Sequence, residues 1–162
     1  MRRWCMLLLA LGCGDVDAVL ELDLGLPADA DRVAVVQARR GSVGFEDAWD
    51  ASGSVAFSLS VAEARSVSIV SDGAYEEPLL VRVRYCSNAA CDALGDERAP
   101  ESRLRIERAF YLGERTFARW NISNVPTDSA PTPDEIGRCE VGGCRDGVAA
   151  SHCRTDGTHF CE

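Results

Sequence analysis

Strict alternation of apolar and polar residues is the feature that most constrains the fold of this chain. In the segment 19–26, VLELDLGL, four leucines fall on one face of an extended chain and two acidic residues fall on the other. Because successive side chains of a strand point to opposite faces, this pattern predicts a half-buried β-strand. Related patterns recur along the 162-residue chain, which shows almost no helical periodicity.

Six further segments are predicted to be strands, at residues 32–39, 54–61, 66–73, 79–86, 103–110 and 115–122. In the third of the seven, the alternation places four apolar residues inward, Val55, Phe57, Leu59 and Val61. The last two segments flank only four residues and therefore predict a hairpin. Seven short strands at fairly even spacing predict an all-β fold, an antiparallel sandwich of immunoglobulin-like or fibronectin III-like architecture.

The composition changes twice after the predicted sandwich, which spans residues 18–123. Residues 124–137 contain three prolines and no apolar alternation, so we expect an extended connector there. Residues 138–162 form a tail that is rich in cysteine and poor in large apolar residues. Because such a tail has too few large apolar residues to form a core, we expect disulfides to stabilise its fold.

The amino-terminal residues have the layout of a secretory signal peptide. Basic Arg2 and Arg3 precede the apolar run 4–11, which is too short to span a bilayer because that takes about 20 residues. Small residues then lead to Cys13. This start resembles the lipobox of bacterial lipoprotein precursors, in which a cysteine after such a segment becomes the lipid-modified first residue; Ala10 stands where that family usually has Leu.

The resemblance implies that residues 1–12 are removed, that Cys13 carries the lipid, and that residues 13–17 form a short anchored linker. Ordinary signal-peptidase cleavage at the same bond is the alternative. The lipid of such proteins has two or three acyl chains, which suffice for stable anchoring to a membrane. We therefore expect the protein in the cell envelope. Gly14, directly after the cysteine, implies sorting to the outer membrane. Both faces of that membrane, the periplasmic and the surface-exposed one, stay possible locations.

Charge and composition narrow the class of partner. Without residues 1–12 the chain has 15 basic and 26 acidic residues, a net charge of −11. This excess disfavours binding to nucleic acid, which needs a basic surface. All 17 basic residues are arginines, a bias typical of GC-rich bacterial genomes.

Six cysteines remain once Cys5 is removed with the signal and Cys13 is acylated: Cys86, Cys91, Cys139, Cys144, Cys153 and Cys161. An even number in an exported chain predicts three disulfides. Cys86 ends the predicted strand 79–86, and Cys91 follows five residues later, so a disulfide between them would close one short loop. In the tail, a hairpin turn at Asp156-Gly157 would put Cys153 and Cys161 on opposite faces, which disfavours their pairing.

For the tail we favour the pairs Cys139–Cys153 and Cys144–Cys161, and the other arrangements stay open. The lipobox-like start, β-domain, strand-end cysteine pair and cysteine-rich terminus together resemble predicted lipoproteins of GC-rich Gram-negative bacteria. This resemblance covers most of the chain and implies no activity.

Zinc binding is the alternative for the tail, because His152 and His159 lie among its cysteines. Zinc ligands usually come in pairs separated by two to four residues, and the spacing here is looser. An oxidising compartment also favours disulfides. We therefore predict neither a metal site nor a cofactor.

The sequence contains no Cys-x-x-Cys pair of a thiol oxidoreductase and no Gly-x-Ser-x-Gly elbow of a serine hydrolase. We predict that the protein is not an enzyme. The expected function is a non-catalytic binding or structural module for another envelope protein or a polysaccharide. The alternative is a surface hydrolase that uses loop carboxylates, which would require a concave acidic cleft with two carboxyl groups of perturbed pKa.

Three residues are candidates for contacting a partner. Trp49 lies between acidic residues and is either an exposed stacking platform or part of a packed loop. Arg82 and Arg84 occupy outward positions of a predicted strand and, with Arg103 and Arg105, could form a basic stripe. The alternative for these arginines is cross-strand pairing with acidic residues such as Glu107. Trp120 alternates with apolar neighbours and is predicted to lie in the core.

Overall fold

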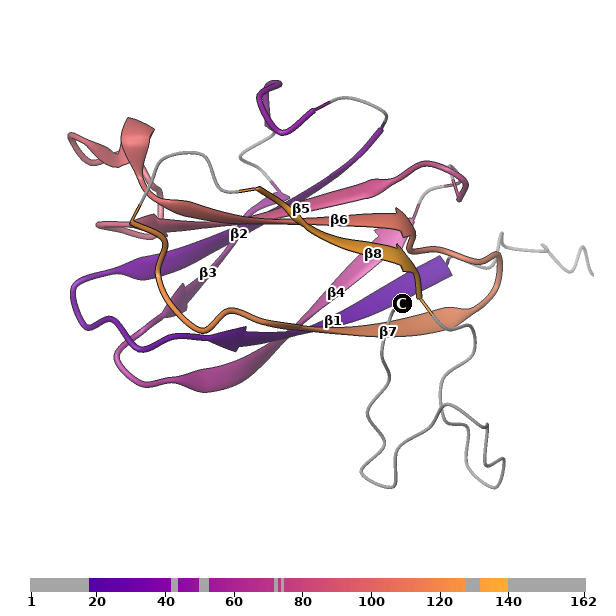
Figure 1. The fold of residues 1–162 in the computed structure, drawn as a ribbon, viewed down its shortest axis with the longest axis horizontal. Helices are drawn as coiled ribbons and strands as arrows, with labels where there is room; N and C mark the ends of the chain where they lie inside the picture. Colours follow the sequence, from indigo (N-terminus) through magenta and orange to yellow (C-terminus); the bar gives the residue numbers. More distant parts are fainter. Residues whose placement is uncertain are drawn as a thin grey trace, which may run out of the picture.

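The structure, a computed structural model, describes residues 18–41, 44–49, 53–71, 73, 75–127 and 132–139. Within these ranges the chain forms eight strands in two sheets that pack face to face (Figure 1). The predicted all-β sandwich is confirmed.

The smaller sheet has the strand order β4-β1-β7, with β1 (Ala18–Leu26) between β4 (Glu63–Ser71) and β7 (Arg115–Asn121). Strand β1 is antiparallel to β4 and parallel to β7. The parallel pair departs from the purely antiparallel arrangement that we expected.

The larger sheet has the strand order β3-β2-β5-β6-β8. Its strands are β2 (Val33–Arg40), β3 (Val55–Ser58), β5 (Leu79–Cys86), β6 (Glu101–Arg108) and β8 (Asp134–Arg138). Strands β6 and β8 are parallel, and the other neighbours are antiparallel. A short 3-10 helix, Asp96–Arg98, lies in the β5–β6 connection.

The connections interlock the two sheets. The chain crosses from the smaller to the larger sheet between β1 and β2, and it does so again between β4 and β5. Because β1 pairs with β4 and β2 pairs with β5, the two crossings lie side by side. This is a Greek-key arrangement of the kind found in immunoglobulin-like sandwiches.

The core is filled by the inward faces of both sheets. The alternation in β1 is confirmed, because Leu20, Leu22 and Leu24 are fully buried. The alternate residues of β5 face them from the other sheet, and Trp120 of β7 is 5% exposed, as predicted for a core residue. Burial of one such large apolar side chain contributes about 1.5–3 kcal/mol to stability.

The hairpin predicted for 103–110 and 115–122 is wrong. The two strands there, β6 and β7, belong to different sheets. Consecutive residues Ala109 and Phe110 are both fully buried, and a strand cannot turn two successive side chains into one core. The chain therefore leaves the larger sheet at this point. The hydroxyl of Thr116 donates to the carbonyl of Ala109 across 2.7 Å and ties the crossing to β7.

The stretch 124–137, predicted as a connector, ends in a strand. Strand β8 adds to the larger sheet beside β6, so the sandwich extends beyond residue 123. Ile136 packs against the core, and the indole N–H of Trp120 donates to Oδ2 of Asp134 across 2.7 Å. A strand with one partly buried apolar residue has too weak an alternation to be seen in the sequence.

The segment 54–61 also differs from its predicted pattern. Leu59 is buried, but Val55 and Val61 are 42% and 56% exposed. Strand β3 ends at Ser58 and, among the described strands, pairs with β2 alone, so it lies at the edge of the larger sheet. The carbonyl of Leu59 instead accepts a hydrogen bond from the amide of Asp29.

The predicted disulfide between Cys86 and Cys91 is present, with 5.2 Å between the two Cα atoms. Cys139 is buried and is also disulfide-bonded. The expected pairs Cys139–Cys153 and Cys144–Cys161 include residues outside the described ranges. Cys13 and the predicted signal segment 1–12 also lie outside the described residues. In the described part of the chain no helix has the length and apolar character needed to cross a bilayer.

Candidate functional site

The candidate site lies on the outward face of the larger sheet, where β2, β5 and β6 run side by side. Gln37, Arg82 and Arg103 are direct partners across these three strands. Two residues further along β5, Arg84 is opposite Glu101. Because outward positions alternate, all of these polar side chains leave the sheet on the same side.

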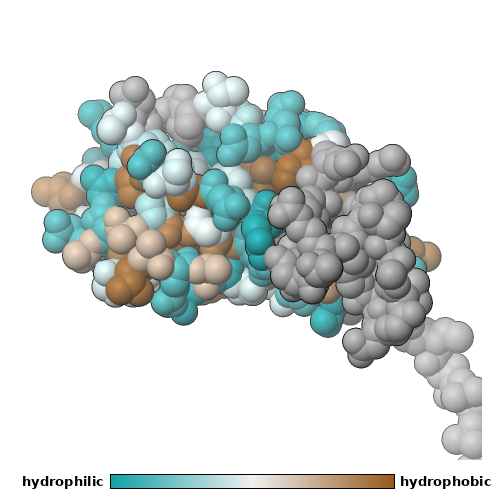
Figure 2. Space-filling view, turned by 60° about the horizontal axis from the view of Figure 1, so that its bottom comes forward, coloured by the Kyte–Doolittle hydropathy of each residue, from teal (hydrophilic) through white to brown (hydrophobic). Residues whose placement is uncertain are grey.

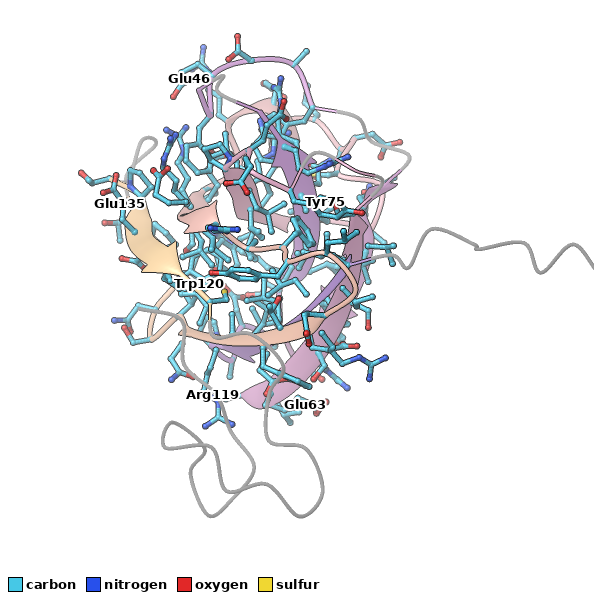
Figure 3. All side chains as sticks on the ribbon, turned by 90° about the vertical axis from the view of Figure 1, so that its right-hand side faces the viewer. Glu46, Glu63, Tyr75, Arg119, Trp120 and Glu135 are labelled. Carbon is cyan, nitrogen blue, oxygen red and sulfur yellow. A yellow bond between two sulfur atoms is a disulfide. The ribbon has the colours of Figure 1, made fainter. Side chains whose placement is uncertain are left out.

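The 44–49 loop covers part of this face. Its aromatic rings, Phe45 and Trp49, stack with their centroids 6.1 Å apart, and the indole N–H of Trp49 donates to the carbonyl of Phe45 across 3.1 Å. Arg39 of β2 donates to the carbonyl of Ala48 across 2.7 Å. Figure 3 shows Glu46 of this loop at the outer side of the larger sheet.

Arginines of the sheet hold the loop through its aromatic rings. The guanidinium carbons of Arg82 and Arg39 lie 4.4 Å and 5.8 Å from the centroid of Trp49. The guanidinium carbon of Arg103 lies 5.4 Å from the centroid of Phe45. A cation near the face of an aromatic ring is attracted by the ring quadrupole, so each contact stabilises the docked loop.

An open cleft of about 400 Å³ lies between the loop and the β5–β6 connection. We call it the arginine cleft. Its lining residues are Phe45, Glu46, Asp47, Arg82, Arg84, Glu97, Glu101 and Arg103. All of them except Phe45 are charged, and they come from one loop, two adjacent strands and the 3-10 helix. Loops placed on a rigid sheet are the usual location of binding residues.

Glu101 lies between two of the arginines. Its Oε1 atom is 2.6 Å from Nε of Arg103, and its Oε2 atom is 3.8 Å from a terminal nitrogen of Arg82. Arg103 also pairs with Glu46 across 2.8 Å, and Nε of Arg82 donates to Gln37 across 2.8 Å. The floor of the cleft is therefore a connected network of charged and polar groups.

Burial changes the acid–base properties of these arginines. Burial lowers the pKa of Arg82 to about 10; Glu101 opposes this, and the neighbouring arginines add to it. Arg82 stays protonated at neutral pH. Burial also acts to lower the pKa of Arg103, but hydrogen bonds to Glu101 and Glu46 outweigh it, so the net direction is upward. The two cations thus differ in how well their charge is compensated.

The β5–β6 connection is held against the sheet by Asp96. Its carboxylate accepts hydrogen bonds from the backbone N–H and the hydroxyl of Ser87, each across 3.0 Å. Its carbonyl accepts a hydrogen bond from Arg84. Because the Cys86–Cys91 disulfide closes the first part of the same connection, the 3-10 helix that carries Glu97 is fixed beside the cleft.

The structure brings the three predicted partner-binding residues to one place. Arg82 and Arg84 line the cleft, and Trp49 lies behind it with a face against Arg82. Trp49 is therefore a packed anchor of the loop. The cross-strand pairing considered as the alternative occurs for Arg82, which lies 3.8 Å from Glu101 of β6, whereas Arg105 pairs with Glu107 of its own strand across 2.5 Å.

The sequence did not indicate Phe45, Glu46 or Glu101 as site residues. Glu101 precedes the predicted strand 103–110, and only the structure shows that β6 begins at Glu101 and places it on the same face as Arg103. For the two loop residues the sequence held no signal, because only the fold brings them over the sheet.

One group of possible metal ligands occurs among the described residues, formed by Cys86, Cys91 and Asp96. Both sulfur atoms are joined in the disulfide, so neither is a free thiolate ligand. Of the cysteines considered for zinc, only Cys139 belongs to the described part of the chain.

The outward face of the smaller sheet offers a contrast. There the acidic residues of β1 are paired: Ser68 and Ser66 donate to Glu21 and Asp23, and Arg115 and Arg119 form longer ion pairs with the same two acids. Figure 2, in which the lower side of Figure 1 comes forward, shows hydrophilic side chains interspersed with hydrophobic ones. On this face the two acidic residues of β1 therefore already have polar partners.

No protein-family model, curated protein or solved structure matches this chain. The function must therefore be inferred from the site itself.

Proposed function

We propose that the protein is a non-catalytic binding module, anchored by lipid in the cell envelope, and that the arginine cleft binds another envelope protein or a polysaccharide. One observation carries the proposal. Three arginines and an aromatic ring converge on an open cleft between two loops, on a chain whose net charge is strongly negative. The outward face of the smaller sheet has its acidic residues paired instead.

The geometry of the carboxylates supports binding over hydrolysis. Glycoside hydrolysis needs two carboxyl groups that flank the scissile bond and are free to contact it. Both oxygens of Glu101 are directed at arginines, and Glu46 pairs with Arg103. These two acids of the cleft therefore already have partners, and they serve to position the arginines.

Crosslinking in intact cells tests the binding role. A photo-crosslinking amino acid at Asp47, on the cleft, should capture a discrete envelope component. The same group at Val70, 57% exposed on β4, is the matched control. A Cys13→Ala form, which has no lipid anchor, should lose the capture if anchoring brings the two together. Equal capture of bulk membrane protein from both positions would sink the proposal.

The proposed anchor has a separate test. Mass spectrometry of the protein from its native host should find acylated Cys13 at the amino terminus, and the protein should partition into detergent. Retention of residues 1–12 together with partition into the aqueous phase would remove the anchoring and the envelope location.

A further inference from the structure

The arginine cleft contains a pair of like charges placed directly opposite each other. Arg82 and Arg103 are cross-strand partners of β5 and β6, an arrangement that destabilises a sheet unless something neutralises it. Glu101 does so only in part. It forms a short contact with Arg103, but its distance to Arg82, 3.8 Å, is too long for a hydrogen bond.

Arg84 adds a third positive charge to the same cleft. Its guanidinium donates to the backbone carbonyl of Asp96, and its charge also acts on the Asp96 carboxylate, but no carboxylate of the described residues lies within ion-pair distance of it. A guanidinium has five N–H donors, so both Arg82 and Arg84 keep donors that none of the described residues accepts. The side chain of Arg82 is only 16% exposed, which limits how much water can solvate its charge.

A carboxylate is the ligand group that best fits this arrangement. Arginine binds carboxylates through two parallel hydrogen bonds, and such charge-assisted bonds are about twice as strong as neutral ones. A carboxylate between Arg82 and Arg84 would accept from both and would compensate the charge of Arg82, the member of the like-charge pair that Glu101 leaves without a short contact. Both arginines are preorganised for such a ligand, because Gln37 accepts a hydrogen bond from Arg82 and the Asp96 carbonyl accepts one from Arg84.

The rest of the cleft favours a sugar over a protein as the carrier of that carboxylate. The cores of protein interfaces are depleted in charged residues, whereas Phe45 is the one apolar residue among the described residues that line this cleft. Sugar hydroxyls both donate and accept hydrogen bonds. They can therefore use the exposed acceptors Asp47 and Glu97 as well as the arginine donors. A cleft of about 400 Å³ is within the usual range for small ligands.

We propose that the arginine cleft binds a polysaccharide that carries carboxylates, with one sugar carboxylate held between Arg82 and Arg84. This inference rests on the proposed binding function and names the class of its ligand. The negative charge of the whole chain opposes a polyanion at long range. At physiological ionic strength that repulsion is screened beyond about 8 Å, so the contacts inside the cleft decide binding.

Calorimetry on the full chain purified in detergent tests the inference with three probes: oligogalacturonate, its methyl ester and polyaspartate. Oligogalacturonate should bind. The methyl ester has the same sugar without the charge, and its affinity should be lower by about tenfold or more. Equal binding of acid and ester would overturn the inference. So would binding of polyaspartate alone, which would indicate an acidic protein.

Substitutions assign the binding to the cleft. Arg84→Gln should weaken oligogalacturonate binding by about tenfold. Arg84→Lys keeps the charge without the planar fork and should recover only part of the affinity. Arg119→Gln is the control, since Arg119 lies on the opposite side of the molecule (Figure 3). The urea midpoint of each variant shows whether it is folded, and a folded Arg84→Gln protein with full affinity would also overturn the inference.

The two proposals can fail separately. If position 47 captures a discrete envelope protein in cells while no uronate binds in solution, the ligand class is wrong and the binding function stands. If position 47 captures only bulk protein and uronate does not bind, both are wrong.

Discussion

The guanidinium of Arg82 lies over the ring of Trp49, with 4.4 Å between its central carbon and the ring centroid. This contact joins the 44–49 loop to the central strand of the larger sheet. The same guanidinium donates to Gln37 and faces Glu101 at the floor of the arginine cleft. Arg82 therefore does two things at once, because it anchors the loop that forms one wall and supplies charge to the floor.

Trp49→Ala should detach the 44–49 loop without unfolding the sandwich. The substitution removes the ring that contacts Arg82 and Arg39, interactions worth about 0.5–2 kcal/mol each. Local opening then becomes easier, and loop amides such as that of Asp47 should exchange faster with deuterium. The control is Tyr111→Ala, which removes a similar contact with Arg108 in the β6–β7 connection. Equal loop exchange in both variants and in the wild type would show that the ring does not hold the loop.

The strands of the core could be predicted because their alternation is strong. Strand β1 places a leucine at every second position from Leu20 to Leu26, and β5 combines inward apolar residues with outward arginines. In both strands burial on one face determines the register, so the pattern and the structure agree. Strand β8 has no comparable pattern. Its place beside β6 depends on Ile136 and on the bond between Trp120 and Asp134, two contacts that only the tertiary fold creates.

Some residues of the site could be predicted from the sequence, but their assembly into one site could not. Alternation placed Arg82 and Arg84 on the outward face, and the acidic neighbours of Trp49 suggested a surface loop. That the loop lies over the arginines depends on how residues far apart in sequence meet, and that information is not local. The direct pairing of Arg82 with Arg103 likewise requires the β5–β6 register, which the intervening connection of 14 residues does not determine.

Leu22→Ala should be among the most damaging substitutions. Leu22 is fully buried at the middle of the central strand of the smaller sheet, and its removal leaves a cavity between the two layers. Loss of a buried leucine side chain usually costs about 2–5 kcal/mol. Leu112→Ala, at a position 67% exposed, should change stability by less than about 0.5 kcal/mol. Urea denaturation compares the two. Similar midpoints would contradict the assignment of the core.

Cys86→Ser together with Cys91→Ser should lower stability by about 2 kcal/mol, because the disulfide closes a short loop with a sequence separation of five. The double variant avoids a free thiol. The hydrogen bonds from Ser87 to Asp96 remain, so the connection should stay folded and the loss should appear as a lower urea midpoint with an unchanged slope. A midpoint equal to that of the wild type would show that these hydrogen bonds hold the connection unaided.

Asp96 should make stability depend on pH in the acid range. Burial acts to raise the pKa of its carboxyl group, but the hydrogen bonds from Ser87 and the charge of Arg84 outweigh burial and hold the pKa below its ordinary value. A depressed pKa means that the folded state favours the ionised form. The contribution of Asp96 is therefore full above the unfolded-state pKa of about 3.9, and it is lost as the pH falls through the folded-state value.

Asp96→Asn tests this dependence, because an amide cannot ionise and accepts the Ser87 hydrogen bonds with only one oxygen. The variant should unfold at a lower urea concentration than the wild type at neutral pH. The gap between the two midpoints should narrow as the pH falls below about 3.9, because the wild-type carboxylate then becomes protonated. Asp92→Asn changes an exposed acid in the same connection and controls for the general effect of removing a negative charge. A gap that stays constant from neutral pH to about pH 3 would mean that packing of the β5–β6 connection, and not ionisation of Asp96, accounts for the difference.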